Sequence, residues 1–368
     1  MVISVGGGGW GPPAVPIDYG EIGDAATALS AGSWDDISTL TNVTAITDST
    51  GPSGSSPLTA WTDADSEIPK SHLNWPGKAT WDAARKRVVV VGASNGYSSE
   101  TPVGTHSAFI KLNVESGQFS RQWNPTGTQQ AHIYDGNQSL VWNGKVYRKD
   151  YDPGHLYACD LTTDTWSLVD TLSVIAYGEI SALDVHPNMG ASGSVILVSA
   201  NGRVTSYDIA TDTATQLFAS TTGVGATGEP VASYSRSLDA IVFGGGQGSG
   251  YLYKLTADGT RTLITSTLPT GMTGIGPEGS ATETVLLPDP QGRDYAWLFD
   301  ARTTRKVWRL TLSTGSYDSG SALPTAFAVP RWYTGAAIPE LGVHLFIDGD
   351  VRSSTTVSTS RVWLFKPA

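Results

Sequence analysis

The chain has 368 residues, a formal net charge of -11, 42 glycines, one cysteine and 15% charged residues. An acidic surface repels nucleic acid and anionic membranes, so neither is an expected partner, and one cysteine excludes a disulfide framework or a cysteine-cluster metal site. No run approaches the roughly 20 apolar residues of a membrane span, and residues 1–10 lack the basic start and apolar core of a signal peptide, so we expect no membrane insertion and no secretory export.

Residues 1–29 begin with "MVISVGGGGW" and continue with "GPPAVPIDYG". Glycine and proline at this density are typical of irregular chain, so we expect an N-terminal arm here. The region around Trp10 is the part that we expect to bind other proteins of an assembly. The glycine run is not a phosphate-binding loop, because neither a strand-helix frame nor a Lys-Ser/Thr pair follows it.

Residues 44–70 form a long polar connection that leads into the repeats described below. Within it "DADSE", residues 63–67, resembles the start of a calcium-binding loop. The sixth position of such a loop is a glycine and the twelfth a glutamate, whereas this chain has Ile68 and Asn74. We therefore interpret this stretch as a solvated loop and expect no metal.

Beyond residue 70 one pattern repeats six times. An apolar position recurs in a strand-like segment of each repeat, and its members are Leu112, Cys159, Tyr207, Leu255, Leu310 and Phe365. Successive members are 47, 48, 48, 55 and 55 residues apart, which is the length of one four-stranded propeller blade. The period predicts an all-β fold of six blades.

Each repeat carries two further signals around this anchor position. An apolar strand precedes it, and these strands are expected at residues 87–93, 194–200, 240–246, 295–301 and 343–349, with a looser match at 139–149. A residue that opens another strand follows about seven positions later, and these residues are Phe119, Trp166 and Tyr317, with Ala214 and Arg261 as weaker members. Each repeat is therefore predicted to contain two strands, a tight turn and an outer strand.

The repeats resemble those of kelch-type β-propellers. The likeness is carried by "AIVFGGGQGSGYLYKL", where Gly244 to Gly246 end a strand, and by "LYACDLTTDTWSL", where Tyr157 and Trp166 fall about where a kelch repeat has its aromatic pair. It covers approximately residues 70–368. It implies a ring of four-stranded antiparallel blades.

The sixth repeat ends at Ala368 without an outer strand, which would leave an open ring with an exposed edge. Residues 30–43 contain "SWDD", where Trp34 resembles Trp166 and has no repeat of its own. We expect this segment to be the missing strand, so that Trp34, Trp363 and Phe365 close the ring. The chain then divides into an arm (1–29), a closing strand (30–43), a connection (44–70) and the blades (71–368).

Polar residues stand just before the first strand of each blade, where a propeller chain lies near the central channel. They are His72, His132, Glu179, Glu229, Glu278 and Arg331. Converging glutamate and histidine side chains bind a cation or a polar ligand. The alternative is that they form hydrogen bonds between neighbouring blades.

A second candidate surface is aromatic and consists of Trp61, Trp75, Trp332 and Tyr333, in segments that resemble loops. Aromatic faces beside Asp and Asn suit a cell-surface glycan. They equally suit a protein partner or simple packing between blades.

Cys159 occupies an anchor position, which favours a buried core residue. The functional alternative is a copper-radical oxidase of the galactose-oxidase type, which is built on a kelch-type propeller and uses a cysteine cross-linked to a tyrosine. The six histidines show no metal-ligand spacing, so we expect no cofactor and no catalytic residues.

These features favour a non-catalytic binding or structural protein of a larger assembly. The acidic, Gly-, Ser- and Thr-rich composition behind a glycine-rich arm resembles that of phage tail and capsid-associated proteins, which implies a virion location, or a cytoplasmic one if the chain is not viral. Two alternatives stay open: a carbohydrate-active enzyme or copper oxidase, and a cytoplasmic kelch interaction module.

Overall fold

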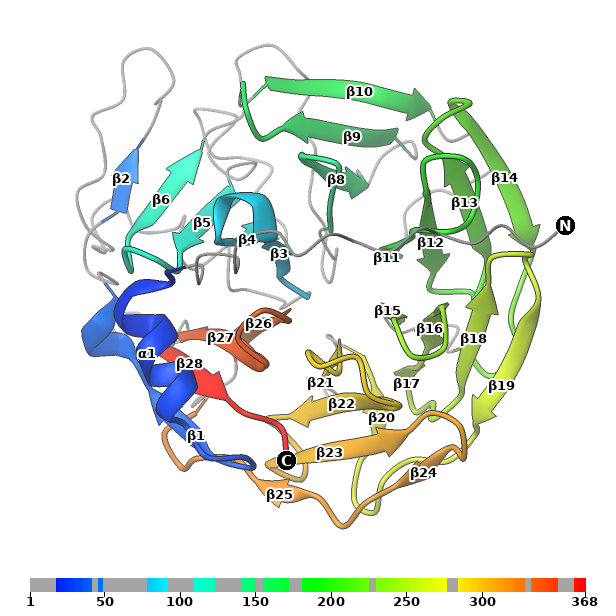
Figure 1. Cartoon of the computed structure of the whole chain (residues 1–368). Helices are drawn as coiled ribbons and strands as arrows, with labels where there is room; N and C mark the ends of the chain where they lie inside the picture. The colour runs from blue at the N-terminus through cyan, green and yellow to red at the C-terminus, as the bar shows by residue number, and fades with distance from the viewer. Residues whose placement is uncertain are drawn as a thin grey trace, which may run out of the picture.

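The computed structural model describes residues 18–41, 46–48, 78–91, 109–122, 140–149, 155–163, 165–171, 181–224, 230–276, 284–327, 332–349 and 361–368. In these residues six antiparallel sheets are arranged around a ring as the blades of a propeller (Figure 1). The predicted all-β, six-bladed fold is thereby confirmed. Within the described part of the chain, no helix has the length and apolarity needed to cross a membrane.

Four strands form each blade, from the channel outward. Blade 1 is β3 (Thr80–Asp82), β4 (Arg87–Val91), β5 (Phe109–Asn113) and β6 (Phe119–Gln122). Blade 2 is β7 (Leu140–Trp142), β8 (Lys145–Lys149), β9 (His155–Asp160) and β10 (Thr165–Thr171). Blade 3 is β11 (Ser181–His186), β12 (Ser194–Ser199), β13 (Val204–Asp208) and β14 (Thr213–Phe218).

The second half of the ring follows the same order. Blade 4 is β15 (Val231–Ser235), β16 (Ala240–Gly244), β18 (Leu252–Thr256) and β19 (Arg261–Thr265). Blade 5 is β21 (Thr284–Pro288), β22 (Tyr295–Asp300), β23 (Lys306–Thr311) and β24 (Ser316–Tyr317), with β25 (Ser321–Ala322) also paired to β23. Blade 6 is β26 (Trp332–Ile338), β27 (Val343–Gly349), β28 (Arg361–Phe365) and β1 (Trp34–Asp36).

Two short additions complete the sheets. β2 (Ile46–Asp48), from the predicted connection, runs parallel to β6 and adds a fifth strand to blade 1. β17 (Gly246–Gln247) pairs with β20 (Gly274–Ile275) beside blade 4.

The anchor positions lie in the third strand of each blade, and all six are at most 3% exposed. The residue about seven positions later pairs with the anchor across the outer hairpin, as Leu112 does with Phe119 and Leu310 with Tyr317. The looser match at 139–149 differs from expectation, because it contains two strands. Asn143 and Gly144 have positive φ there (50° and 75°) and form the hairpin turn between β7 and β8.

Ring closure follows the sequence prediction. β1 pairs antiparallel with β28, and Trp34 stands opposite Phe365 in the position that the outer-strand residue has in other blades. The partly buried Trp34 ring lies 4.8 Å from the Phe365 ring and 4.9 Å from the Phe327 ring, measured between centroids. Trp363 is 5% exposed in the same cluster.

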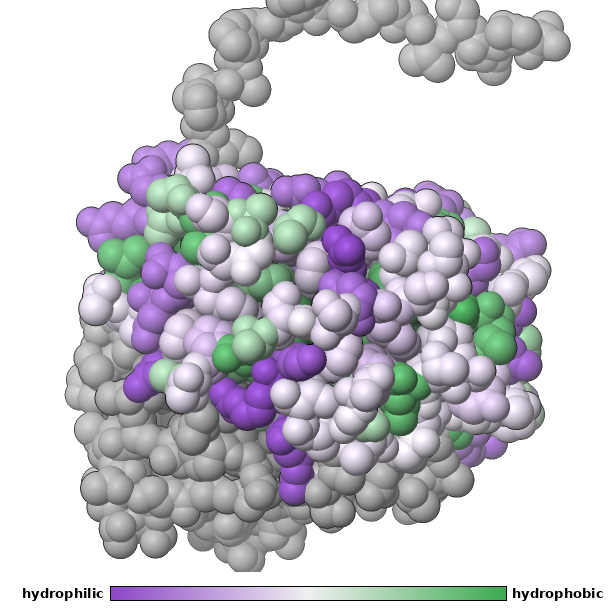
Figure 2. Space-filling view, turned by 90° about the horizontal axis from the view of Figure 1, so that it is seen from below, coloured by the Kyte–Doolittle hydropathy of each residue, from purple (hydrophilic) through white to green (hydrophobic). Residues whose placement is uncertain are grey.

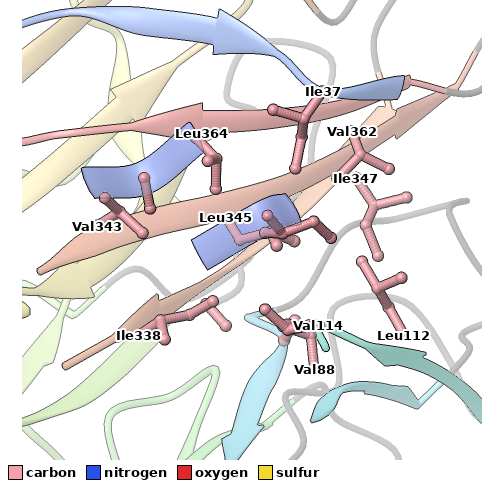
Figure 3. Close-up of a cluster of buried hydrophobic side chains, with 14 of the residues drawn as sticks. Ile37, Val88, Leu112, Val114, Ile338, Val343, Leu345, Ile347, Val362 and Leu364 are labelled. Atoms are coloured by element: carbon pink, nitrogen blue, oxygen red, sulfur yellow. The ribbon is translucent and has the colours of Figure 1, made fainter. Parts of the chain in front are cut away.

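Residues 20–28, inside the predicted irregular arm, form a helix that the sequence does not predict. α1 (Gly20–Ala28) buries Ile22 and Ala26 at 1% and 0% exposure. They join the apolar cluster between the first and last blades, where Val88 and Leu112 of blade 1 face side chains of blade 6 (Figure 3). The helix therefore covers the seam at which the ring closes.

Candidate functional site

The innermost strand of each blade presents one unpaired edge to the channel, and its backbone groups need partners there. The segment Lys78–Thr80, which leads into blade 1, supplies several of them. The Ala79 N–H donates to the carbonyl of Gly335 in blade 6 at 2.9 Å. The hydroxyl of Thr80 accepts the N–H of Val141 in blade 2, also at 2.9 Å. This segment thus links blade 1 to both of its neighbours.

Lys78 extends further, across the centre of the ring. Its ammonium forms an ion pair with Asp184 on β11 and donates to the carbonyl of Ala232 on β15 at 3.1 Å. The Asp184 carboxylate also accepts the N–H of Tyr234 at 2.9 Å. Blades 1 and 4 are opposite each other in the six-bladed ring (Figure 1), so these contacts link the segment that precedes blade 1 to blades on the other side of the channel.

The ammonium of this ion pair is buried, since Lys78 is 8% exposed, and the Asp184 side chain is mostly buried at 15% exposure. A buried ammonium is tolerated only when its charge and its donors are matched by partners. Asp184 supplies the charge, and the Ala232 carbonyl takes a second N–H. The pair therefore forms a polar bridge without net charge that joins blades 1, 3 and 4 at the centre of the ring.

The residues predicted at the channel mouth, His72, His132, Glu179, Glu229, Glu278 and Arg331, all lie outside the described residues. So do Trp10, Trp61 and Trp75. Sequence reasoning missed Lys78 and Asp184, which are 106 residues apart. The one available signal was a lone aspartate within the apolar strand "SALDVH".

The predicted aromatic surface is wrong for Tyr333. This residue lies on β26 with an exposed fraction of 0%, and its hydroxyl donates to the backbone carbonyl of Phe299 in blade 5. It is a core residue between blades 5 and 6, because its ring is buried and its polar end has a partner. Trp332 belongs to the same strand, and its side chain is outside the described part.

Cys159 has the core role expected from its anchor position. It is fully buried beside Val89, Val146, Tyr157 and Leu161. Within the described residues no group of three or more histidine, cysteine, aspartate or glutamate side chains is arranged to hold a metal ion.

Two buried histidines connect neighbouring blades. His186 of blade 3 is 3.1 Å from the carbonyl of Asp239 in blade 4, and His344 of blade 6 is 2.9 Å from the carbonyl of Pro288 in blade 5, both through Nε2. Burial lowers the pKa of His186, and it lowers the pKa of His344 to about 4. Both imidazoles are neutral near pH 7, where Nε2–H donates to the carbonyl.

A hollow of about 700 Å³ lies between α1 and the turn that joins β26 to β27. Its lining residues are Asp18, Tyr19, Gly20, Gly23, Asp24, Thr27, Glu340 and Leu341. The sequence did not indicate this site, because half of it is built by the helix that was not expected.

The outer edge of the ring is mostly polar where it is visible. Figure 2 shows hydrophobic residues in small groups that polar residues separate. The large hydrophobic side chains exposed in the described residues are Leu168 and Leu263, on the outer strands β10 and β19. Among the described residues on this side of the ring, no broad apolar patch is visible.

No family model and no curated protein sequence matches this chain. Among solved structures, it is similar to regucalcin, a calcium-binding protein from Agrobacterium tumefaciens strain C58, with a TM-score of 0.51 and 14% identity over 82% of this chain and 95% of that one. A Bacteroides thetaiotaomicron protein of unknown function matches with a TM-score of 0.49 and 13% identity over 78% and 70%. A luciferin-regenerating enzyme matches with a TM-score of 0.47 and 8% identity over 78% and 90%. At such identities the regucalcin likeness shows the propeller fold alone.

Proposed function

We propose that this protein is a non-catalytic binding propeller of a larger assembly, attached through its N-terminal segment, with a tail or capsid-associated position in a phage virion as the assembly that its composition fits best. The observation that carries the proposal is that the N-terminal segment is built into the ring. β1 is the outer strand of blade 6, and α1 covers the seam between blades 1 and 6. The residues before α1 are therefore connected through α1 and β1 to the blade that closes the ring, so an assembly that binds these residues would hold the propeller by that blade.

Several of the described ionisable side chains form hydrogen bonds that stabilise the fold, which supports a scaffold role for the protein. Burial acts to raise the pKa of Asp289, but the bonds that it accepts from Arg293 and from the indole of Trp297 outweigh this effect and lower the pKa. Asp300 accepts the backbone N–H groups of Thr303 and Thr304 in a turn. These groups stabilise turns and blade contacts, as do His186 and His344.

We place the binding face of the propeller at the channel mouth. Glu179 and Glu229 each stand two residues before an innermost strand, and Arg331 stands one residue before β26. Innermost strands of a propeller begin at the same face of the ring, so side chains just before them are candidates for one shared site. A receptor or glycan bound there is expected to lose affinity in a Glu179→Gln, Glu229→Gln variant.

The attachment is tested with a variant that lacks residues 2–17 and retains α1 and β1. Particles from the native source are separated on a density gradient, and the amount of this chain per particle is measured by quantitative mass spectrometry. We expect a fixed stoichiometry for the full chain, and loss of the shortened chain from the particles without a change in melting temperature. A full-length chain that migrates only as a free monomer would contradict the assembly and favour a cytoplasmic interaction module.

The enzyme alternative is tested on the same preparation. A copper-radical oxidase would contain copper and a tyrosine cross-linked to Cys159, which lowers the peptide mass by two hydrogens. The packing of Cys159 among apolar side chains supports its role as a core residue. We therefore expect an uncross-linked Cys159 peptide.

A further inference from the structure

We propose that Arg305, Lys306 and Arg361 form a surface at the border of blades 5 and 6 that binds the carboxylate groups of an acidic glycan. The inference rests on the proposed binding function, to which it adds the chemical class of the partner. The affinity of the surface for a carboxylated sugar is tested on the isolated chain, without the assembly.

The three cations lie around the segment that connects blade 5 to blade 6. Arg305 Nη2 donates to the carbonyl of Phe327 at 2.7 Å, and Arg361 Nη1 donates to the carbonyl of Ala326 at 3.2 Å. Lys306 follows Arg305 in the chain, and its Nζ donates to another carbonyl of the same segment at 3.2 Å. Ala326 and Phe327 are consecutive residues, whose Cα atoms are about 3.8 Å apart. The two guanidinium groups are therefore close neighbours, although they belong to different blades.

The surface lies on the face of the ring at which the innermost strands begin. In blade 5, the strand register places Lys306 level with the first residue of β21. In blade 6, it places Arg361 level with the second residue of β26. Blades 5 and 6 are neighbours in the ring (Figure 1). The three cations are therefore on the same face as the channel mouth at which the binding site is proposed.

The positive charge of this surface is not neutralised by ion pairs. None of the three cations forms one within the described residues, because their bonds go to backbone carbonyls. Asp300 stands opposite Lys306 across the strands, and Asp348 stands opposite Arg361, but these carboxylates are 1% and 3% exposed. Asp300 accepts backbone N–H groups of its turn, and Asp348 accepts the indole N–H of Trp363 at 3.0 Å. Three cations against two buried carboxylates leave a local positive surplus on a chain of net charge -11, and such a surplus attracts anions.

Arg361 presents the geometry that a carboxylate requires. Its guanidinium is held by the Ala326 carbonyl, and its Cζ lies 6.0 Å from the Trp363 ring centroid. Its Nε and Nη2 have no partner among the described residues, and neither atom is buried. This edge of the guanidinium can therefore donate two parallel hydrogen bonds to one carboxylate. Lys306 Nζ lies 4.8 Å from the Trp308 ring centroid and is bonded once, so two of its three N–H donors are available.

The surroundings of the cations favour a sugar over a protein partner. Trp308 and Trp363 are 4% and 5% exposed, and Leu323 and Phe327 of the connecting segment are 7% and 0% exposed. A protein interface depends on apolar or aromatic anchors at its centre, and no large apolar side chain is exposed here among the described residues. Hydroxyl groups beside cations match the hydroxyl and carboxylate groups of a uronic or sialic acid. The exposed residues that supply these hydroxyl groups are Ser319, Ser321 and Thr325.

The experiment follows the indole N–H resonance of Trp308 in the full chain, because this ring lies beside Lys306 and its N–H is bonded to Thr304. The resonance is assigned with a Trp308→Phe variant. The acidic probes are trigalacturonic acid, a uronic acid oligomer, and 3′-sialyllactose. Maltotriose and lactose are their neutral counterparts, and N-acetyl-triglutamate represents an acidic peptide. Sugars of this size are expected to bind with dissociation constants of about 1 mM.

Two variants test whether the cations carry the binding. Lys306→Gln and Arg361→Gln each keep a hydrogen-bond donor for the connecting segment and remove one positive charge. Each should weaken binding of an acidic sugar about two- to fivefold. Lys145→Gln is the matched control, since Lys145 is an exposed lysine that follows the β7–β8 turn at the opposite face of the ring. It should leave binding unchanged.

The outcomes separate the surface from the identity of its partner. Saturable shifts with either acidic sugar, reduced by added salt and by both variants, support the proposal, and the tighter of the two sugars identifies the source of the carboxylate. Equal shifts with the neutral sugars, no shift up to about 50 mM of either acidic sugar, or shifts that both variants leave unchanged overturn it. Tighter binding of the glutamate peptide than of both acidic sugars overturns the glycan as the partner. The particle experiment for the proposed function does not depend on any of these results.

Discussion

The ammonium of Lys366 donates to the backbone carbonyl of Ala26 at 3.0 Å, so a residue at the end of the chain caps the C-terminal end of α1. The surrounding backbone is also paired, since Lys366 exchanges bonds with Gly32 and Ser33. Arg293 of blade 5 in turn donates to the carbonyl of Ala368 at 2.8 Å. Hydrogen bonds therefore connect the two ends of the described chain to each other and to the neighbouring blade.

Replacing Lys366 by Met should lower the free energy of unfolding by about 0.5–1.5 kcal/mol, because a cation at a helix C-terminus and its hydrogen bond are both lost. Urea denaturation followed by circular dichroism measures the change. Lys145→Met serves as the matched control, since Lys145 is an exposed lysine on β8 of blade 2. Equal destabilisation by the two substitutions would show that Lys366 does not act through α1.

The second prediction concerns the contact between Trp34 and Phe365 that closes the ring. Trp34→Ala should destabilise the protein by about 2–3 kcal/mol, less than for a fully buried tryptophan, because this ring is partly exposed. A double-mutant cycle with Phe365→Ala should give a coupling energy of about 0.5–1.5 kcal/mol. Leu168→Ala, on an exposed outer-strand residue of blade 2, is the control and should change stability little. A coupling energy of zero would refute direct closure through this pair.

The closure of the ring by β1 could be predicted from sequence because it uses the same pairing of an anchor residue with an outer-strand aromatic residue that recurs in other blades. Trp34 pairs with Phe365 as Phe119 pairs with Leu112, and the missing outer strand of the last repeat pointed to a segment elsewhere in the chain. The period of the anchor positions likewise predicted the number of blades. Such signals survive in a single sequence because each blade has to bury the same positions.

Other features have no local signature. "GEIGDAATA" contains two glycines and spans nine residues, so its helix depends on the packing of Ile22 and Ala26 against the ring seam. "PRWYTG" resembles a loop, yet Tyr333 is fixed in β26 by the Phe299 carbonyl of another blade. The contact between Lys78 and Asp184 joins positions far apart in the chain, and the ring alone brings them together.

The third prediction concerns this central ion pair. Lys78→Met should destabilise the protein by up to about 3 kcal/mol, because it leaves the mostly buried Asp184 carboxylate without its partner. The double variant Lys78→Met, Asp184→Leu should recover part of the loss, since no unpaired charge remains. Recovery is incomplete because the Ala232 carbonyl and the Tyr234 N–H lose their partners. The changes in stability are measured by thermal denaturation. If the losses caused by Lys78→Met alone and by Asp184→Leu alone added up to the loss in the double variant, the ion pair would not be the source of the effect.

The last prediction concerns pH and His344. Its ring is enclosed by Trp297, Phe299, Phe346 and Phe365, with ring centroids 5.3 to 6.4 Å away. Nε2 is bonded to the Pro288 carbonyl, and buried Nδ1 has no partner among the described residues. A proton on Nδ1 would therefore place an unsatisfied charge in an aromatic environment, and Asp289 and Arg293, the charged groups that act on the ring, oppose each other. This explains why burial holds the pKa of His344 at about 4, below its ordinary 6.5.

The unfolded chain binds a proton at this histidine more readily than the folded chain does. The free energy of unfolding therefore has its full value with respect to His344 above pH 6.5, and it decreases as the pH falls toward 4. The loss attributable to His344 should reach about 3 kcal/mol. His344→Gln retains a donor for the Pro288 carbonyl and does not titrate, so its stability should depend less on pH between 6.5 and 4 than that of the unmodified protein. The comparison also separates His344 from Asp289, whose lowered pKa makes it lose stabilising charge only at more acidic pH. Parallel curves of unfolding free energy against pH for the two proteins would show that His344 does not set the acid sensitivity of the closing blade.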